Sequence, residues 1–258
     1  MNARKFFPGV FVLALLTYAG ICAALYGKQR SLMYYPQNTR VDNATTDFEV
    51  DHDGKRLRGW ALNRDGRNPI LYFGGNAERV ENNRRDFGRL FPGRPVYLLA
   101  YRGYGASDGE ASEHALLGDA LAIYDAVHQR HPGQPVSVIG RSLGSGIASY
   151  VASQRSVSKL ALVTPFDSLA SVAQAHYTWL PVQWLIKDRY PSIDFLHDYK
   201  GDVMVISAGR DEVVLAQNTK RLIASLPKPP QVVGIETANH NSVSQDPAYG
   251  RALSKYMR

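Results

Sequence analysis

The arrangement of apolar segments beyond residue 45 restricts the fold of this chain more than any other feature of its sequence. Short apolar runs alternate with longer stretches of helical periodicity, which is typical of a mostly parallel sheet covered by helices. The first two runs are joined by Asp53-Gly54, so we expect them to form an antiparallel hairpin. The expected strands are residues 46–50, 57–62, 69–73, 95–100, 135–139, 160–164, 203–207 and 231–235, and the expected helices end near residue 90, span 113–130, end near residue 154, span 215–226 and close the chain over 244–257.

The N-terminal segment has a different character, because residues 6–27 contain no charged side chain and are mostly apolar. A stretch of this length can cross the hydrocarbon core of a bilayer once as a helix. The apolar region of a cleaved signal peptide is shorter, about 7–15 residues. We therefore expect an uncleaved membrane anchor within residues 1–30, followed by one folded domain over residues 31–258.

Basic residues flank this run on both sides, Arg4 and Lys5 before it and Lys28 and Arg30 after it. The positive-inside rule therefore gives little direction, although the first two residues and the terminal amine favour a cytoplasmic N-terminus. This orientation predicts that the folded domain lies on the periplasmic or luminal side of the membrane.

The formal net charge of +7 raises the question of nucleic-acid binding. The basic residues are scattered, however, and the sequence contains no nucleic-acid recognition motif, so we expect no nucleic-acid partner. A basic surface facing anionic lipid explains the charge equally well. The single cysteine, Cys22, allows no intrachain disulfide. We also expect no metal and no organic cofactor, because the sequence shows neither zinc-ligand spacing nor a phosphate-binding glycine motif.

The segment Gly140-Arg141-Ser142-Leu143-Gly144 fits the pattern of a nucleophile elbow. In such an elbow a sharp strand-to-helix turn exposes a serine, and small residues two positions away let neighbouring backbone approach closely. The pattern alone is weak, but here it follows a strand-like run and opens a helix of small residues, as the motif requires. Ser142 is therefore the predicted nucleophile.

A serine hydroxyl needs a base, and the base needs an acid that orients it. In an elbow of this kind the chain order is serine, acid, histidine. Only His240 follows the last expected strand, and we expect the histidines before the serine to lie at the surface. Asp211, in the loop after residues 203–207, is the predicted acid, with Asp167 and Glu212 as the alternatives.

An oxyanion hole requires two backbone N–H groups near the nucleophile. One is expected from Leu143, and the other from the glycine-containing loop after residues 69–73, at Asn76 or Gly75. The alternative interpretation of this loop is an ordinary strand-to-helix turn in which Asn76 caps the helix. Both interpretations can hold together, because the backbone N–H of Asn76 can bind the oxyanion while its side chain caps the turn.

Residues 165–200 interrupt the alternation of strands and helices, and they contain patches of aromatic and apolar residues. They form either a helical connection packed on the core or a small cap over the site. In the second case the apolar inner face of the cap holds part of the substrate, and the candidate contacts are Trp179, Leu180 and Trp184.

Five segments together resemble the BEM46-like α/β-hydrolases, and the similarity extends over nearly the whole chain. They are residues 29–36, residues 101–107, residues 140–146, the acid loop at 209–211 and Asn239-His240. The resemblance implies the α/β-hydrolase fold, a Ser-Asp-His triad at the positions above, and hydrolysis of ester or thioester bonds in lipids or acylated proteins.

Two features depart from the family pattern. The family carries His-Gly-Asn in the oxyanion loop, whereas this chain has Gly74-Gly75-Asn76. The N-terminal cysteine cluster of relatives that act on palmitoylated proteins is also missing, which argues against that specific role. Two other functions stay open: a peptidase or amidase with the same triad, and a catalytically silent binding protein tethered to the membrane.

Overall fold

The computed structural model describes residues 3–258, and the side chains from residue 9 onward. Its centre is an eight-stranded sheet in the order β1-β2-β4-β3-β5-β6-β7-β8. The first two strands are antiparallel to their neighbours, and β3 to β8 run parallel to one another. The strands are β1 Phe48–His52, β2 Lys55–Leu62, β3 Ile70–Phe73, β4 Val96–Leu99, β5 Val136–Arg141, β6 Val157–Val163, β7 Val203–Ala208 and β8 Gln231–Ile235.

All eight expected strands are present, and the expected antiparallel hairpin is confirmed at β1 and β2. Asp53 and Gly54 both have positive φ, 52° and 65°, which is the backbone conformation that a two-residue hairpin of this twist requires. The helix expected soon after β3 begins only at Arg84, because residues 74–83 first form a loop and a short 3₁₀ turn.

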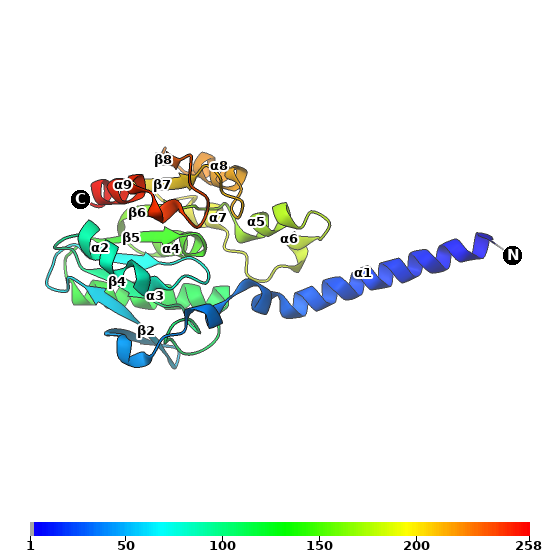
Figure 1. Cartoon of the computed structure of the whole chain (residues 1–258), viewed down its shortest axis with the longest axis horizontal. Coiled ribbons are helices and arrows are strands. Elements are labelled where there is room, and N and C mark those ends of the chain that lie inside the picture. Colours follow the sequence, from blue (N-terminus) through cyan, green and yellow to red (C-terminus); the bar gives the residue numbers. More distant parts are fainter. Residues whose placement is uncertain (1–2) are drawn as a thin grey trace.

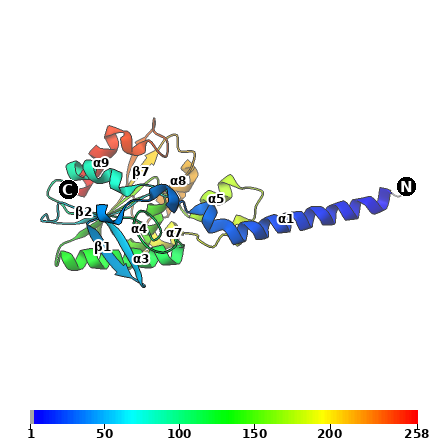
Figure 2. The same cartoon turned by 60° about the horizontal axis from the view of Figure 1, so that its bottom comes forward.

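Helices cover both faces of the sheet (Figures 1 and 2). Neighbouring side chains of each central strand point to opposite faces, so Leu71 joins a core with α3, α4 and α8, whereas Tyr72 joins a core with α2 and α9. Because both faces are covered, these strands are apolar throughout. The domain helices are α2 Arg84–Leu90, α3 Glu113–Arg130, α4 Leu143–Gln154, α5 Leu169–His176, α6 Val182–Leu185, α7 Ser192–Leu196, α8 Ala216–Ser225 and α9 Pro247–Met257.

The N-terminal helix α1, Ala3–Met33, projects from the domain, and only its C-terminal part lies against it (Figure 1). Within the described residues it is the one helix that is both long and apolar enough to cross a membrane, a property that signal sequences share. Arg30 forms two hydrogen bonds with Asp188, at 3.0 and 3.1 Å, and the hydroxyls of Tyr34 and Tyr190 lie 2.8 Å apart.

Residues 165–200 form the three short helices α5, α6 and α7. The last of these packs on α4, as a helical connection would. The other two lie beside the domain end of α1 and away from the sheet (Figures 1 and 2). This interval therefore combines a packed connection with a projecting part.

Candidate active site

Ser142 lies between β5 and α4, with φ 50° and ψ −118°. Such a conformation costs a non-glycine residue about 1–3 kcal/mol and persists only where its surroundings enforce it. Here they do, because a Cβ on Gly140 would collide with the carbonyl oxygen of Gly144, and a Cβ on Gly144 with that of Phe73. The two glycines of the motif therefore let β5, α4 and the end of β3 meet behind the serine.

The structure brings Ser142, His240 and Asp211 into one hydrogen-bonded chain. The Oγ of Ser142 lies 2.9 Å from Nε2 of His240, and Nδ1 of His240 lies 2.8 Å from Oδ2 of Asp211. A carboxylate accepts from Nδ1–H, which leaves Nε2 as the acceptor for the serine hydroxyl. These three side chains come from three different loops. Their geometry is that of a nucleophile, Ser142, beside a base, His240, which the carboxylate of Asp211 orients.

Each of the two partner loops is held by its own hydrogen bonds. The second carboxylate oxygen of Asp211, Oδ1, accepts from the N–H groups of Val213 and Val214 at 2.9 and 2.8 Å. The side chain of Asn239 accepts from two N–H groups of the following turn. Asp211 and His240 are nearly buried, with side-chain exposures of 5% and 10%, so their orientation depends little on solvent.

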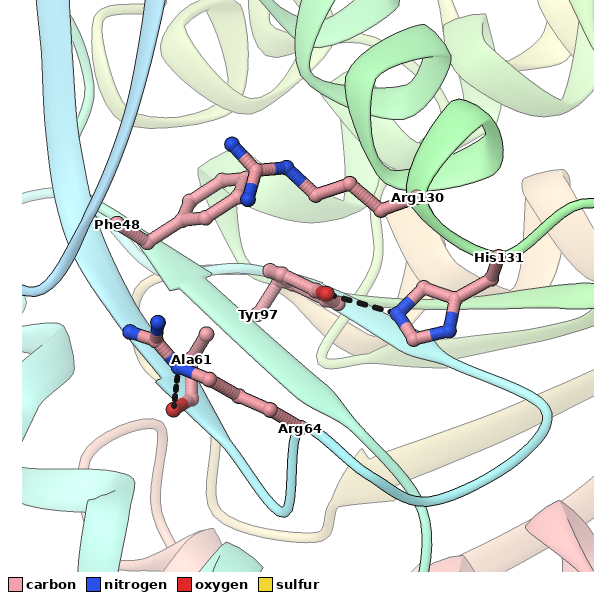
Figure 3. Close-up of a pocket in the computed structure, with 6 residues that line it drawn as sticks. All are labelled: Phe48, Ala61, Arg64, Tyr97, Arg130 and His131. Atoms are coloured by element: carbon pink, nitrogen blue, oxygen red, sulfur yellow. Dashed lines mark hydrogen bonds between the residues drawn. The ribbon is translucent and has the colours of Figure 1, made fainter.

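Of the two alternative acids, Glu212 is exposed and Asp167 is engaged elsewhere. Asp167 is buried and binds Asn218 and Arg221. His131, which we expected at the surface, is buried, and its Nε2 lies 2.7 Å from the hydroxyl of Tyr97 on β4. It lines a separate small pocket with Arg130 and other residues (Figure 3).

The oxyanion loop lies against the serine, since a Cβ on Gly75 would be 3.6 Å from the Cβ of Ser142. The N–H of Gly75 donates to Oε2 of Glu78 at 2.6 Å, so it is not free to bind a substrate, and this corrects the expectation for that residue. Among residues 3–258, no acceptor contacts the N–H groups of Leu143 and Asn76. These two donors therefore fit the expected oxyanion hole.

The side chain of Asn76 does not cap a helix but links the loop to the end of α1. Its Nδ2 donates to the carbonyl oxygen of Met33, and its Oδ1 accepts from the hydroxyl of Tyr104, both at 2.6 Å. The hydroxyl of Tyr101 donates to the carbonyl oxygen of Gly74 at 2.6 Å. The segment of residues 101–107 thus supports the oxyanion loop through its two tyrosines.

Glu78 is a central residue of the site that sequence reasoning missed. Its carboxylate accepts from the hydroxyl of Tyr72 and the amide of Asn83, both at 2.7 Å, in addition to the N–H of Gly75. It also pairs with Arg141 at 3.1 Å. The one sequence signal was an acidic residue three positions after Gly75 in the glycine-containing loop.

Arg141 connects the same network to the base, because its Nη2 donates to the carbonyl oxygen of His240 at 3.3 Å. Burial is the largest single influence and lowers the pKa of this guanidinium, but Glu78 together with Tyr72 and Tyr249 outweighs it. The pKa therefore lies above its usual range and the group stays charged. Burial and then the nearby Glu78 also raise the pKa of Tyr72, which keeps its hydroxyl a donor.

The three residues expected to line a cap differ in their exposure to solvent. Leu180 is buried, whereas Trp179 and Trp184 are 57% and 88% exposed. The carbonyl oxygen of Trp179 accepts a hydrogen bond from Tyr18 of α1. A role of these residues in substrate binding stays a prediction.

Comparison with known proteins identifies the fold and the family. The model of the Hydrolase_4 family, described as serine aminopeptidase, S33, matches residues 70–202, which is more than half of the chain. The chain belongs to this α/β-hydrolase family. In the hydrolase the match runs from β3 through the elbow and the projecting helices, and it ends just before β7.

The hydrolase is similar to a bacterial protein and to a vertebrate lipase. An uncharacterized protein of Mycobacterium tuberculosis is 34% identical over 247 residues, which cover 91% of this chain and 88% of that protein. The lysophosphatidylserine lipase ABHD12 of Danio rerio is 30% identical over 174 residues, which cover 59% of this chain and 46% of that lipase.

Solved structures show the same fold at low sequence identity. The Pyrococcus furiosus esterase Pf2001 superposes with a TM-score of 0.62 at 16% identity, covering 82% of this chain and 90% of that one. Est1E from Butyrivibrio proteoclasticus, solved with ferulic acid, gives 0.61 at 16% identity and covers 82% and 96% of the two chains.

Proposed function

We propose that this hydrolase is a membrane-anchored serine enzyme that cleaves carboxylic ester or thioester bonds of acyl substrates. The observation that carries the proposal is the continuous hydrogen-bonded chain from Asp211 through His240 to Ser142, on an elbow whose strain is enforced by packing. The strained backbone of Ser142 lowers the stability of the fold, so its presence supports a functional role for this serine.

The geometry supports a two-step acyl transfer. His240 accepts the hydroxyl proton as Oγ of Ser142 attacks the acyl carbonyl, and Asp211 stays ionised and stabilises the imidazolium. The N–H groups of Leu143 and Asn76 receive the oxyanion, with a further contribution from the N-terminus of α4. Collapse expels the alcohol or thiol, which takes its proton from the imidazolium. A water that His240 deprotonates then releases the carboxylic acid and restores the serine.

The triad alone is compatible with ester, thioester and amide substrates. The similarity to other proteins is what favours an ester or thioester. Lipases and esterases are prominent among the similar proteins, and the BEM46-like segments agree with that class. The family description names an aminopeptidase, so a peptidase or amidase is the second candidate. The ratio of kcat/KM for an acyl ester and the matched amide distinguishes the two, and a ratio below one favours the second.

The anchor is part of the proposal because α1 is apolar, exposed along most of its length, and joined to the domain by buried contacts at its C-terminal end. We place the folded domain on the periplasmic or luminal side. Alkaline carbonate extraction tests the anchoring, and protease accessibility in sealed vesicles tests the side.

Fluorophosphonate labelling of the full chain in detergent tests the catalytic assignment. We expect rapid labelling that Ser142→Ala abolishes and that Ser153→Ala, an exposed serine on the same helix, leaves unchanged. Hydrolysis of p-nitrophenyl esters from acetyl to palmitoyl then defines the acyl-chain preference. Equal hydrolysis by the parent and Ser142→Ala would contradict the proposal, and folded parent protein without labelling would favour the binding-protein alternative.

A further inference from the structure

Residues 177–186, here called the cap loop, form an apolar surface that the core does not cover. The segment contains no charged residue, yet Tyr177, Trp179 and Trp184 are 53%, 57% and 88% exposed. An apolar run of this length is typical of either a core segment or one that lies in a membrane interface. Leu180 and Val182 are buried against the domain, but the exposure of the three aromatic side chains favours the membrane interface for the outer face of the loop.

The cap loop lies along α1 (Figures 1 and 2). The hydroxyl of Tyr18 donates to the carbonyl oxygen of Trp179 at 2.9 Å, and their rings are 6.3 Å apart. Closer to the domain, the side chain of Gln29 donates to the carbonyl oxygen of Leu185 at 3.1 Å. Its Oε1 accepts from the N–H of Lys187 at 2.7 Å.

Along the axis of α1, the first charged residues of the helix and of the segment after the cap loop lie at the same height. Lys187 directly follows the cap loop, and its Nζ lies 4.0 Å from the ring centre of Tyr26, one residue before the uncharged run of α1 ends. The next charges, Asp188 and Arg30, pair with each other. Two neighbouring segments that change from apolar to charged at one level are expected where both cross the same membrane interface.

The contact between Tyr18 and Trp179 indicates how deep the cap loop would lie in a bilayer. At about 1.5 Å per residue, Tyr18 lies roughly 14 Å along the helix from Gly27, where the uncharged run ends. The whole run of residues 6–27 is about 33 Å long, close to the roughly 30 Å of a hydrocarbon core. When α1 spans a bilayer with this run, the tip of the cap loop at Trp179 therefore lies among the acyl chains.

The backbone of the cap loop is also suited to an environment without water, in which every polar group needs a protein partner. Side chains from outside the loop bond many of its carbonyl oxygens, although the loop is exposed. Gln174 donates to two of them and Arg189 to a third, at 2.9–3.1 Å, in addition to the bonds from α1. The donors and acceptors are Gln174 to Tyr177 and Leu180, Arg189 to Gln183, Tyr18 to Trp179, and Gln29 to Leu185.

We propose that the cap loop is a second membrane-contacting element, embedded in the lipid beside α1. Its occupant is the acyl region of the bilayer, because the loop is uncharged, its carbonyl oxygens are bonded by neighbouring side chains of the protein, and it lies beside the proposed anchor. The inference rests on the anchoring part of the proposed function, but not on the identity of the substrate.

Tryptophan fluorescence of the full chain in phosphatidylcholine vesicles tests this directly. The chain has three tryptophans, of which Trp60 is buried in the domain while Trp179 and Trp184 belong to the cap loop; α1 has none. Vesicles with lipids brominated near the middle of the acyl chain quench only tryptophans within the bilayer. We expect strong quenching of the parent and of Trp60→Phe, and loss of most of it when Trp179→Phe and Trp184→Phe are combined.

Flotation of the same vesicles after alkaline carbonate washing separates the two possible failures. Protein that floats but shows equally weak quenching in the parent and the double variant would overturn the cap-loop proposal and leave the anchor intact. Blue-shifted emission without quenching would mean that protein, such as a second copy of the chain, covers the loop, and would also overturn it. Protein that does not float would overturn the anchoring and this inference together, while fluorophosphonate labelling of Ser142 would still report on the enzyme.

Discussion

Replacing Glu78 by glutamine tests how the oxyanion loop is held. The carboxylate accepts hydrogen bonds from Tyr72, Asn83 and Gly75 and pairs with Arg141, and both partners of the pair are nearly buried, with side-chain exposures of 10% and 14%. A glutamine has the same size but only one acceptor oxygen. Its NH₂ group must then face at least one buried donor that needs an acceptor.

The size of the effect follows from this mismatch. Removing one partner of a buried ion pair costs about 3–5 kcal/mol, because the other charge is left without compensation. For a domain of this size, about 2–4 °C per kcal/mol gives a fall in melting temperature of roughly 6–20 °C.

The substitution should also affect catalysis, because the loop loses the bond that fixes Gly75 next to the proposed donor Asn76. Loss of an oxyanion donor costs about 100- to 1000-fold in kcat. Displacement of the Asn76 N–H should therefore lower kcat about 10- to 100-fold, with little change in KM for a small ester.

The assay is thermal unfolding and p-nitrophenyl acetate hydrolysis of the full chain in detergent. Glu49→Gln is the matched control, because Glu49 and its partner Arg56 are 56% and 46% exposed, and such a surface pair contributes at most about 1 kcal/mol. Combining Glu78→Gln with Arg141→Met should restore part of the lost stability, since it removes the orphaned charge. Glu78→Gln with the melting temperature and kcat of the parent would refute the assignment of Glu78 as the residue that positions the loop.

Three further measurements follow from the site and its surroundings. Gly144→Ala should destabilise the fold by about 1–3 kcal/mol and abolish fluorophosphonate labelling, because its Cβ meets the backbone of Phe73; normal labelling would contradict the packing argument. Tyr104→Phe should cost about 1 kcal/mol and lower kcat several-fold, because it removes one of the two hydrogen bonds that hold the side chain of Asn76; an unchanged kcat would show that this bond does not matter. Burial lowers the pKa of His131 from its usual 6.5, so the unfolded chain binds the proton first and the free energy of unfolding should fall as the pH drops below about 6.5 towards the lowered value. His131→Gln should flatten that dependence in thermal unfolding between pH 7 and 5, and an equally steep slope would contradict it.

The sequence predicted those features that depend on neighbouring residues. Strand and helix periodicity located all eight strands, since burial on both faces makes each parallel strand continuously apolar. The elbow was recognisable around Ser142 because its turn needs small residues at fixed short spacing. Chain order then pointed to Asp211 and His240, and the structure places these three side chains within hydrogen-bonding distance.

The tertiary structure alone decided the contacts between segments that are distant in the chain. It paired Glu78 with Arg141, joined Asn76 to the end of α1, and placed the cap loop along the proposed anchor. None of these pairs leaves a local pattern, because a hydrogen bond between distant segments requires only one suitable group on each side. Which groups meet depends on how the whole sheet and its connections fold, and that information is spread over the entire chain.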